Sequence, residues 1–200
     1  MDTHPTLDEK KNIRRRELLD AALAEFSAKG YHAAQISDII ARADVARGTF
    51  YLYFKSKREI FGCLLDEIFV LVKGCVEALP KDGVDQIPQK MRENMERLMS
   101  LFINKPEIAR VLLCESVSLD PESDERLKHF YGLLLSFIQI ALKQGQDMGF
   151  VRPANNPLLA VQILGVLKEM LYQKILNLVD YTPGEAVNEL FLTILAMVKK

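Results

Sequence analysis

The chain has 200 residues, 49% of them hydrophobic, with 26 lysines and arginines against 27 aspartates and glutamates. This length fits one or two domains, and the apolar share is enough for a sizeable core, which predicts a globular, soluble protein. The near-neutral total hides an asymmetry. Residues 1–60 hold 11 basic against 9 acidic side chains, whereas residues 61–200 hold 15 against 18. The sign of this difference favours contact with nucleic acid at the N-terminal end.

The cysteines and the apolar runs indicate the cellular compartment. Cys63, Cys75 and Cys114 are odd in number and scattered, which predicts no disulfides and a reducing compartment. Residues 1–16 are charged, which predicts no secretory signal, and no run of about 18 uncharged apolar residues is available to span a membrane. We therefore expect a cytoplasmic protein without a membrane partner.

No residue pattern indicates catalysis. The three histidines, His4, His32 and His129, are not at metal-ligand spacing, and the chain has neither a glycine-rich phosphate loop nor a nucleophile elbow. A catalytic site needs titratable groups that converge on one place. We expect no enzyme activity, no bound metal and no cofactor.

The first helix is predicted to follow a polar tail, Met1 to Glu9. A basic cluster leads into it, formed by Lys10, Lys11, Arg14, Arg15 and Arg16. An arm of this kind can follow the DNA backbone or minor groove. The helix then shows one apolar stripe, made of Leu19, Ala22, Leu23 and Phe26. Gly30 is a good C-terminal stop.

Two short helices around a tight turn are predicted between Ile36 and Glu59. Apolar residues recur at helical spacing up to the turn, and Phe50 and Phe54 then supply a second apolar face four residues apart. Asp44 stands where the turn needs a left-handed backbone, which aspartate tolerates better than most residues. Gly48 costs a helix about 1 kcal/mol relative to alanine, so a glycine here indicates close approach to a partner helix or a phosphate. This arrangement is typical of a helix-turn-helix.

The segment from Arg14 to Phe69 resembles the DNA-binding domain of TetR-family transcriptional regulators. Its most specific part is the string Gly-Thr-Phe-Tyr-Leu-Tyr-Phe-Lys-Ser-Lys, residues 48–57. The resemblance implies a helix-turn-helix domain over residues 1–55 and a helical effector-binding and dimerisation domain over residues 56–200. It also implies a homodimer that holds a palindromic operator and is released when an effector tilts the connecting helix.

Arg47 and Thr49 are expected to reach base edges, because the N-terminal part of the recognition helix enters the major groove. Tyr51 and Tyr53 are expected to donate their hydroxyls to phosphates, and Leu52 to touch a thymine methyl. The full set of DNA-binding candidates is Ser37, Arg47, Gly48, Thr49, Tyr51, Leu52, Tyr53 and Lys57. Val45, Phe50 and Phe54 are assigned to packing.

The chain departs from the family pattern at two capping positions. Many members carry threonine and serine where this chain has Ala34 and Ala46, so two side chains that can cap a helix or contact phosphate are missing. Binding is therefore expected to depend more on Arg47, Tyr53 and Lys57, the last of which adds its charge to a helix N-terminus.

The connecting helix is predicted to begin after Ser56, with Glu59 completing a capping box, and to run to about Leu79. Its length of roughly 36 Å is enough to join the two domains. Prolines near the first helical position mark most of the later helices. These are expected over residues 85–104, 106–116, 121–146, 157–179 and 183–198. No strand pattern competes with them, so the predicted fold class is all-α.

The last two helices are apolar on more than one side, so they need cover all round, and a chain of this size has few spare elements. Pairing with a second copy as a four-helix bundle meets this need. The expected dimer interface comprises Leu164, Leu167, Leu190, Phe191 and Ile194.

The central helices supply enough apolar and aromatic material for a ligand pocket, although a plain core has the same composition. Glu115 and His129 stand out, because a polar group that faces an apolar interior needs a partner, which a ligand can supply. The ligand-binding candidates are Phe102, Leu113, Cys114, Glu115, His129, Phe130, Phe137, Met170 and Tyr172. Cations are scarce among these candidates, which favours a neutral or weakly polar small organic effector over a phosphorylated one.

Other regulatory modes stay open at this point. A DNA-bound scaffold that recruits a protein partner, without sensing a ligand, is the main alternative, and it is favoured if the C-terminal half has no internal cavity. The sign of the response is also open, because an activator or a repressor that needs a corepressor fits the same residues.

Overall fold

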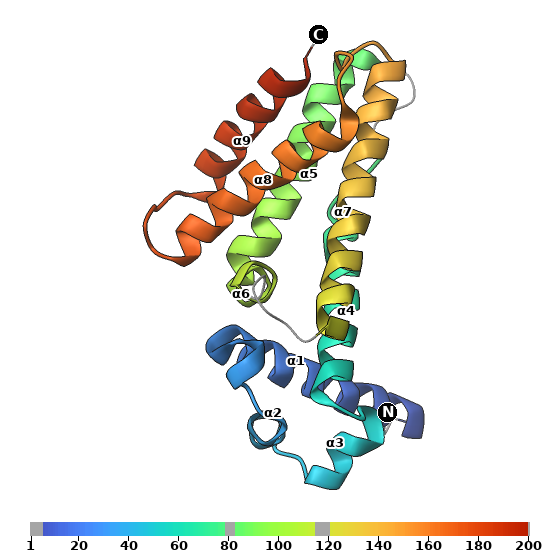
Figure 1. The fold of residues 1–200 in the computed structure, drawn as a ribbon, viewed down its shortest axis with the longest axis vertical. Helices are drawn as coiled ribbons and strands as arrows, with labels where there is room; N and C mark the ends of the chain where they lie inside the picture. The colour runs from blue at the N-terminus through green and yellow to red at the C-terminus, as the bar shows by residue number, and fades with distance from the viewer. Residues whose placement is uncertain (1–5, 79–82, 115–120, 200) are drawn as a thin grey trace, which may run out of the picture.

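The computed structural model describes residues 6–78, 83–114 and 121–199, and the expected all-α fold is confirmed (Figure 1). Within these ranges there is no strand, and one isolated β-bridge joins Val151 to Lys199. None of the helices in these parts of the chain is long and apolar enough to cross a bilayer. The helices are α1 (Leu7–Ala33), α2 (Ile36–Arg42), α3 (Arg47–Tyr53), α4 (Lys57–Gly74), α5 (Ile87–Asn104, after a 3₁₀ turn at Val84–Gln86), α6 (Pro106–Cys114), α7 (Pro121–Asp147), α8 (Asn156–Ile175) and α9 (Pro183–Val198).

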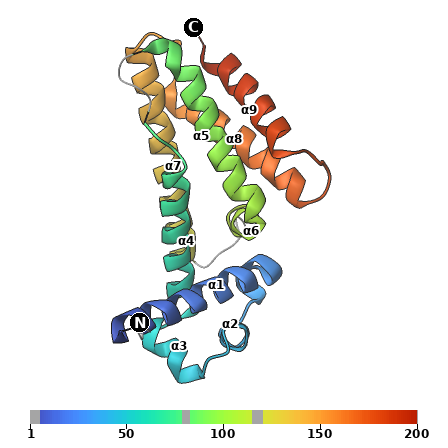
Figure 2. The same ribbon diagram turned by 180° about the vertical axis from the view of Figure 1, so that it is seen from behind.

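The helices form a small unit and a larger bundle. Helices α1, α2 and α3 lie together at one end, and α4 leaves them to run beside α7 (Figures 1 and 2). Helices α5, α8 and α9 lie on the other side of the bundle, where α5 packs on α9 and α8 packs on α7. Helix α6 contacts both α1 and α8, and α4 contacts both α1 and α7. Two helices therefore connect the small unit to the bundle.

Aromatic rings fill the core of the small unit. Phe61 of α4 meets Phe26 and Tyr31 of α1 at centroid distances of 5.5 and 4.7 Å. Phe50 and Phe54 of the α3 region are also fully buried, as their spacing predicts. Such ring pairs add about 0.5–1.5 kcal/mol each to the area that they bury. The core therefore joins α1 to α4 and buries the inner face of α3.

An ionic cluster fixes α2 against α1. The Glu25 carboxylate of α1 pairs with Lys29 at 2.8 Å and with Arg42 of α2 at 2.6 Å. These two cations, Lys29 first, hold the pKa of Glu25 below its ordinary value. Lys29 also reaches Asp38 at the start of α2, at 3.1 Å. Removal of either cation leaves the nearly buried Glu25 carboxylate with less compensation for its charge, so we expect the ion pairs to act as a unit.

The first helix begins earlier than its composition predicts. It starts at Leu7, because Thr6 and Glu9 form a reciprocal capping box, so the expectation of a tail reaching Glu9 is wrong. The helix breaks at Gly30, whose φ is 81°, a value that an alanine adopts only with strain, but helical residues continue to Ala33, beyond the predicted stop. The basic cluster therefore lies on a helix rather than on an arm.

Helix α8 ends four residues before the predicted Val179. Asn177 takes a positive φ of 55°, and the Leu178 amide donates back to the Gln173 carbonyl at 3.1 Å. Asparagine therefore ends α8 in the way that glycine ends many helices. The capping box of Thr182 and Glu185 at the start of α9 is confirmed.

Candidate functional site

The outer face of α3 carries most of the residues that the sequence predicts to contact DNA. Arg47, Gly48, Tyr51 and Leu52 are exposed and share one face of the helix by their spacing, while Thr49 and Tyr53 are half-buried beside them. Leu52 is 80% exposed, although it is a large apolar side chain. Ser37, at the start of α2, is exposed as well. The buried side chains of α3 hold this face toward solvent.

The turn before α3 has the predicted geometry. Asp44 has a φ of 49°, so the left-handed position is confirmed. Ala46 precedes α3 and provides no side-chain cap. A Cβ atom placed at Gly48 meets nothing within 4 Å, so approach to a partner helix does not explain this glycine. No neighbour among the described residues requires a glycine at this position.

Lys57 is placed differently from the expected phosphate contact. Its Nζ donates to the carbonyls of Tyr31 at 2.7 Å, Ala34 at 3.0 Å and His32 at 3.2 Å, and lies 4.6 Å from the Tyr31 ring centre. An ammonium has three donors, and these carbonyls accept all of them. Lys57 therefore ties α4 to the end of α1, and we no longer assign it to phosphate.

The basic cluster of α1 is partly paired with α4. Arg15 and Arg16 reach the Glu67 carboxylate at 3.3 and 3.0 Å, and the Arg15 guanidinium lies 5.5 Å from the Phe54 ring centre. Arg14 pairs with Glu17 on its own helix at 2.7 Å. Arg15 and Arg16 therefore connect α1 to α4, a role that the expectation of a free arm did not include.

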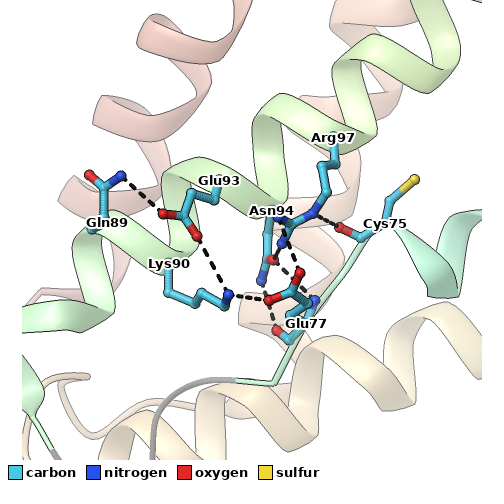
Figure 3. A network of polar contacts seen from close by, with 7 residues as sticks. All are labelled: Cys75, Glu77, Gln89, Lys90, Glu93, Asn94 and Arg97. Carbon is cyan, nitrogen blue, oxygen red and sulfur yellow. Dashed lines mark hydrogen bonds and ion pairs between the residues drawn. The ribbon is translucent and has the colours of Figure 1, made fainter.

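Side chains of α5 bind the backbone that follows α4 (Figure 3). The Asn94 Oδ1 accepts from the Glu77 amide at 3.0 Å, and the Asn94 Nδ2 donates to the Glu77 carbonyl at 2.9 Å. A longer α4 needs these backbone groups for its own hydrogen bonds. The helix therefore ends at Gly74 instead of near Leu79, and the predicted end is wrong.

The same place holds a network of charges. The Glu77 carboxylate pairs with Lys90 and with Arg97, and the Lys90 hydrogen bond, followed by the charge of Arg97, lowers the pKa of Glu77. The Arg97 Nε donates to the Cys75 carbonyl at 2.9 Å. Burial raises the pKa of the Cys75 thiol. The end of α4 is thus held by side chains of α5.

A cavity of about 510 Å³ lies inside the bundle, which is an ordinary size for a ligand pocket. Its wall comes from the end of α4, from α5, α6, α7, α8 and α9, and is mainly aliphatic and aromatic. Four of the predicted ligand residues lie on it, namely Phe102, Leu113, Phe130 and Phe137. His129 is exposed, and neither Met170 nor Tyr172 lines the cavity, so these three assignments do not fit. Glu115 and the Cys114 side chain lie outside what the structure describes.

Most of the expected interface residues lie on the cavity wall. Leu164, Leu167, Leu190 and Ile194 line the cavity, and Leu190 and Ile194 are 2% and 7% exposed. Phe191 is half-buried against the Arg92 guanidinium, 5.7 Å from its ring centre. The reason is that other helices of the same chain already cover this side of α8 and α9. The apolar side chains that these two helices expose are Leu158, Val161 and Leu192, at 62%, 53% and 50%.

Two of the polar side chains on the cavity wall, Tyr131 and Lys168, are not among the ligand-binding candidates named from the sequence. The Tyr131 hydroxyl donates to the Leu112 carbonyl at 2.9 Å, and burial raises the pKa of Tyr131 to about 12. The Lys168 Nζ of α8 lies 4.5 Å from the Tyr131 ring centre. Lys168 and Glu169 end the apolar run of residues 163–167, and a charge at that place is the signal that could have identified Lys168.

Known proteins resemble this chain in both sequence and fold. The family model "Bacterial regulatory proteins, tetR family" matches residues 18–63, which run from α1 into α4. The HTH-type transcriptional regulator YdgC of Bacillus subtilis (strain 168) is 42% identical over 136 residues, which cover 60% of this chain and 70% of that protein. The fatty acid metabolism regulator protein of the same organism is 26% identical over 171 residues, which cover 84% of this chain and 87% of that protein.

A solved structure extends the likeness to nearly the whole chain. The crystal structure of the transcriptional regulator FadR from Bacillus subtilis, in complex with stearoyl-CoA, has a TM-score of 0.76. The match covers 91% of this chain and 98% of that chain at 23% identity. At this identity the likeness shows the fold, which includes the bundle that holds the cavity.

Proposed function

Since the chain belongs to the TetR family of bacterial transcriptional regulators, we propose that it is a repressor which an apolar effector releases from a palindromic operator. The observation that carries the proposal is the apolar cavity of about 510 Å³ beside the end of α4. A DNA-bound scaffold without a ligand needs no such cavity, so we favour sensing over that alternative. The relatives of this chain named above are regulators, and a further one is a repressor; none of them is named as an enzyme. A cytoplasmic location, where bacterial DNA is accessible, belongs to the same proposal.

The exposed face of α3 is the proposed reading surface. Arg47 and Thr49 are placed at the start of the helix, where side chains reach base edges in the major groove. Tyr51 and Tyr53 contact phosphates through their hydroxyls, and Leu52 contacts a thymine methyl. The exposure of Leu52 supports this role, because an isolated chain gains nothing from leaving that side chain in water. Ser37 and Gly48 lie beside the same DNA.

The proposed dimer forms through the outer faces of α8 and α9. Leu158, Val161 and Leu192 are half exposed or more in the single chain, and a second copy related by a two-fold axis covers them. Two reading surfaces then lie at a fixed separation, as a palindromic site requires.

The effector is proposed to contain an acyl chain. The FadR relative has been crystallised with stearoyl-CoA, and the cavity here has a mainly apolar wall. A methylene group fills about the volume of a water molecule, roughly 30 Å³, so the cavity accepts a chain on the order of 12–16 carbon atoms. Such a ligand presses on the end of α4, because Val72 in its last turn and Val76 just after it lie on the wall. A coupling of about 1–3 kcal/mol weakens operator binding 5- to 150-fold.

Selection of bound duplexes from a random library, at moderate salt, tests the proposal. We expect enrichment of a palindrome with half-sites about one helical turn apart. In the variant Val161→Glu, a charge on the exposed face of α8 splits the dimer, and the enriched sequence shortens toward one half-site or is lost. Enrichment of no sequence by the unaltered chain contradicts the proposal.

A further inference from the structure

The cavity wall carries a cation that has no anion beside it among the residues described by the structure. Lys168 is half-buried on this wall, and its Nζ lies 4.5 Å from the Tyr131 ring centre. Among the side chains of the described ranges, no carboxylate forms an ion pair with it. A partly desolvated ammonium is unfavourable unless a hydrogen-bond acceptor or an anion satisfies it. The wall therefore lacks a negative group at this point.

The other charged groups on the wall are satisfied elsewhere or lie in solvent. Glu77 is paired with Lys90 and Arg97 outside the cavity. Lys73, in the last turn of α4, is exposed. Within the described residues, this leaves Lys168 as the half-buried charge on the wall that lacks an oppositely charged neighbour.

Tyr131 holds the ammonium in position without neutralising it. Its hydroxyl donates to the Leu112 carbonyl at 2.9 Å, which fixes the ring. Because burial raises the pKa of Tyr131 to about 12, the ring stays neutral at physiological pH. A cation over a neutral ring keeps its N–H donors for another acceptor.

The shape of the wall fits a long ligand with its head at Lys168. The residues of α7 that line the cavity run from Phe130 to Gln144, a stretch of about 20 Å along the helix. Tyr131, and therefore Lys168, lies at the first end of this stretch. Beyond it the lining side chains of α7 are apolar as far as Gln144, including Leu134, Phe137 and Ile138.

We propose that Lys168 binds the anionic head group of a long-chain acyl ligand, while the hydrocarbon tail lies along α7. The proposal rests on the proposed function. It replaces the neutral effector that the sequence predicts with an acidic amphiphile. The negative charge is either the carboxylate of a free fatty acid or a phosphate of its CoA thioester. A charge-assisted contact of this kind is among the stronger hydrogen bonds in proteins.

Calorimetric titration of the full chain with dodecanoic acid, dodecanol and dodecanoyl-CoA tests the assignment. Lys168→Met keeps most of the length of the side chain and removes its charge. We expect it to weaken binding of at least one of the two anionic ligands about 10- to 100-fold, and binding of dodecanol less than about 3-fold. Lys168→Arg restores most of the affinity. Lys143→Met, an exposed change on α7 away from the cavity, serves as the matched control.

Each pattern of results has a distinct meaning. A loss for dodecanoic acid assigns a carboxylate to Lys168, and a loss for dodecanoyl-CoA alone assigns a phosphate. A loss of the same size for all three compounds, or no loss for either anionic ligand, overturns the role of Lys168 and leaves the apolar cavity as the effector site. If none of the three compounds binds the unaltered chain, the proposed effector class is wrong as well. Thermal unfolding without ligand verifies that each variant is folded.

Discussion

The small unit and the bundle use aromatic side chains in opposite ways. In the small unit, Phe26, Tyr31 and Phe61 contact one another, and all three rings are buried. In the bundle, Phe130 and Phe137 lie on the wall of a cavity of about 510 Å³. A filled core holds one shape, whereas a hollow core gains new contacts when a ligand enters. We therefore expect the small unit, with its proposed reading surface, to be rigid, and the bundle, with its proposed effector site, to adapt to a ligand.

We expect the largest effect when one ring is truncated in each region and the two losses of stability are compared. Phe61→Ala removes a fully buried ring and should lower the free energy of unfolding by about 3–5 kcal/mol. Phe137→Ala removes a half-buried ring that already borders empty space, and we expect about 1–2 kcal/mol. Urea denaturation measures both values. Similar losses at the two sites contradict a filled and a hollow core.

Arg47→Ala is expected to act on recognition and to leave the fold intact. The side chain is exposed at the start of α3, so its loss should cost about 1–3 kcal/mol at the selected operator and relax the base preference there. Fluorescence anisotropy at fixed salt, on the operator and on random DNA, measures the effect. Lys105→Ala, exposed in the bundle, is the control. Equal weakening on both DNAs argues for a phosphate contact instead.

Lys57→Met separates a structural role from a DNA contact. Three carbonyls accept hydrogen bonds from this partly exposed ammonium, so we expect a loss of about 1–2 kcal/mol in the free energy of unfolding. The salt dependence of DNA binding should stay the same. Unchanged stability combined with a flatter salt slope returns Lys57 to the phosphate contacts.

Gly48→Ala should change the free energy of unfolding by less than the two phenylalanine variants or Lys57→Met do, and in the opposite direction. The helix tolerates a Cβ at this position, since nothing lies within 4 Å, and alanine favours a helix by about 0.5–1 kcal/mol. If the glycine exists for close approach of DNA, the stabilised variant binds the operator several-fold more weakly. Thermal unfolding and anisotropy measure the two effects, and undiminished affinity removes Gly48 from the interface.

The same contrast explains what the sequence predicts well. In the small unit the determinants are local: Asp44 and Gly30 occupy backbone conformations that their residue types indicate, and Phe50 and Phe54 share a face by spacing alone. Helix starts with local caps, such as Thr182 with Glu185, are equally readable. The division into residues 1–55 and 56–200 and the contacts with DNA stay predictions.

Distant contacts explain what the sequence analysis misses. The end of α4 depends on Asn94, 17 residues beyond the Glu77 backbone that it binds. The carbonyls that accept from Lys57 lie 23 to 26 residues earlier in the chain. Helices α8 and α9 are apolar on several sides, so spacing does not decide whether Leu190 faces the cavity or a second copy. In each case the deciding partner comes from another helix.

Operator affinity measured while an acyl ligand is added tests most directly whether the hollow bundle controls the reading surface. The selected duplex is titrated by anisotropy with the unaltered chain and with Leu134→Trp, whose larger side chain occupies the cavity. We predict that dodecanoic acid or dodecanoyl-CoA weakens binding of the unaltered chain 5- to 150-fold, and that Leu134→Trp binds the duplex but does not respond. Affinity that is independent of both ligands, or an unchanged response in Leu134→Trp, contradicts the coupling.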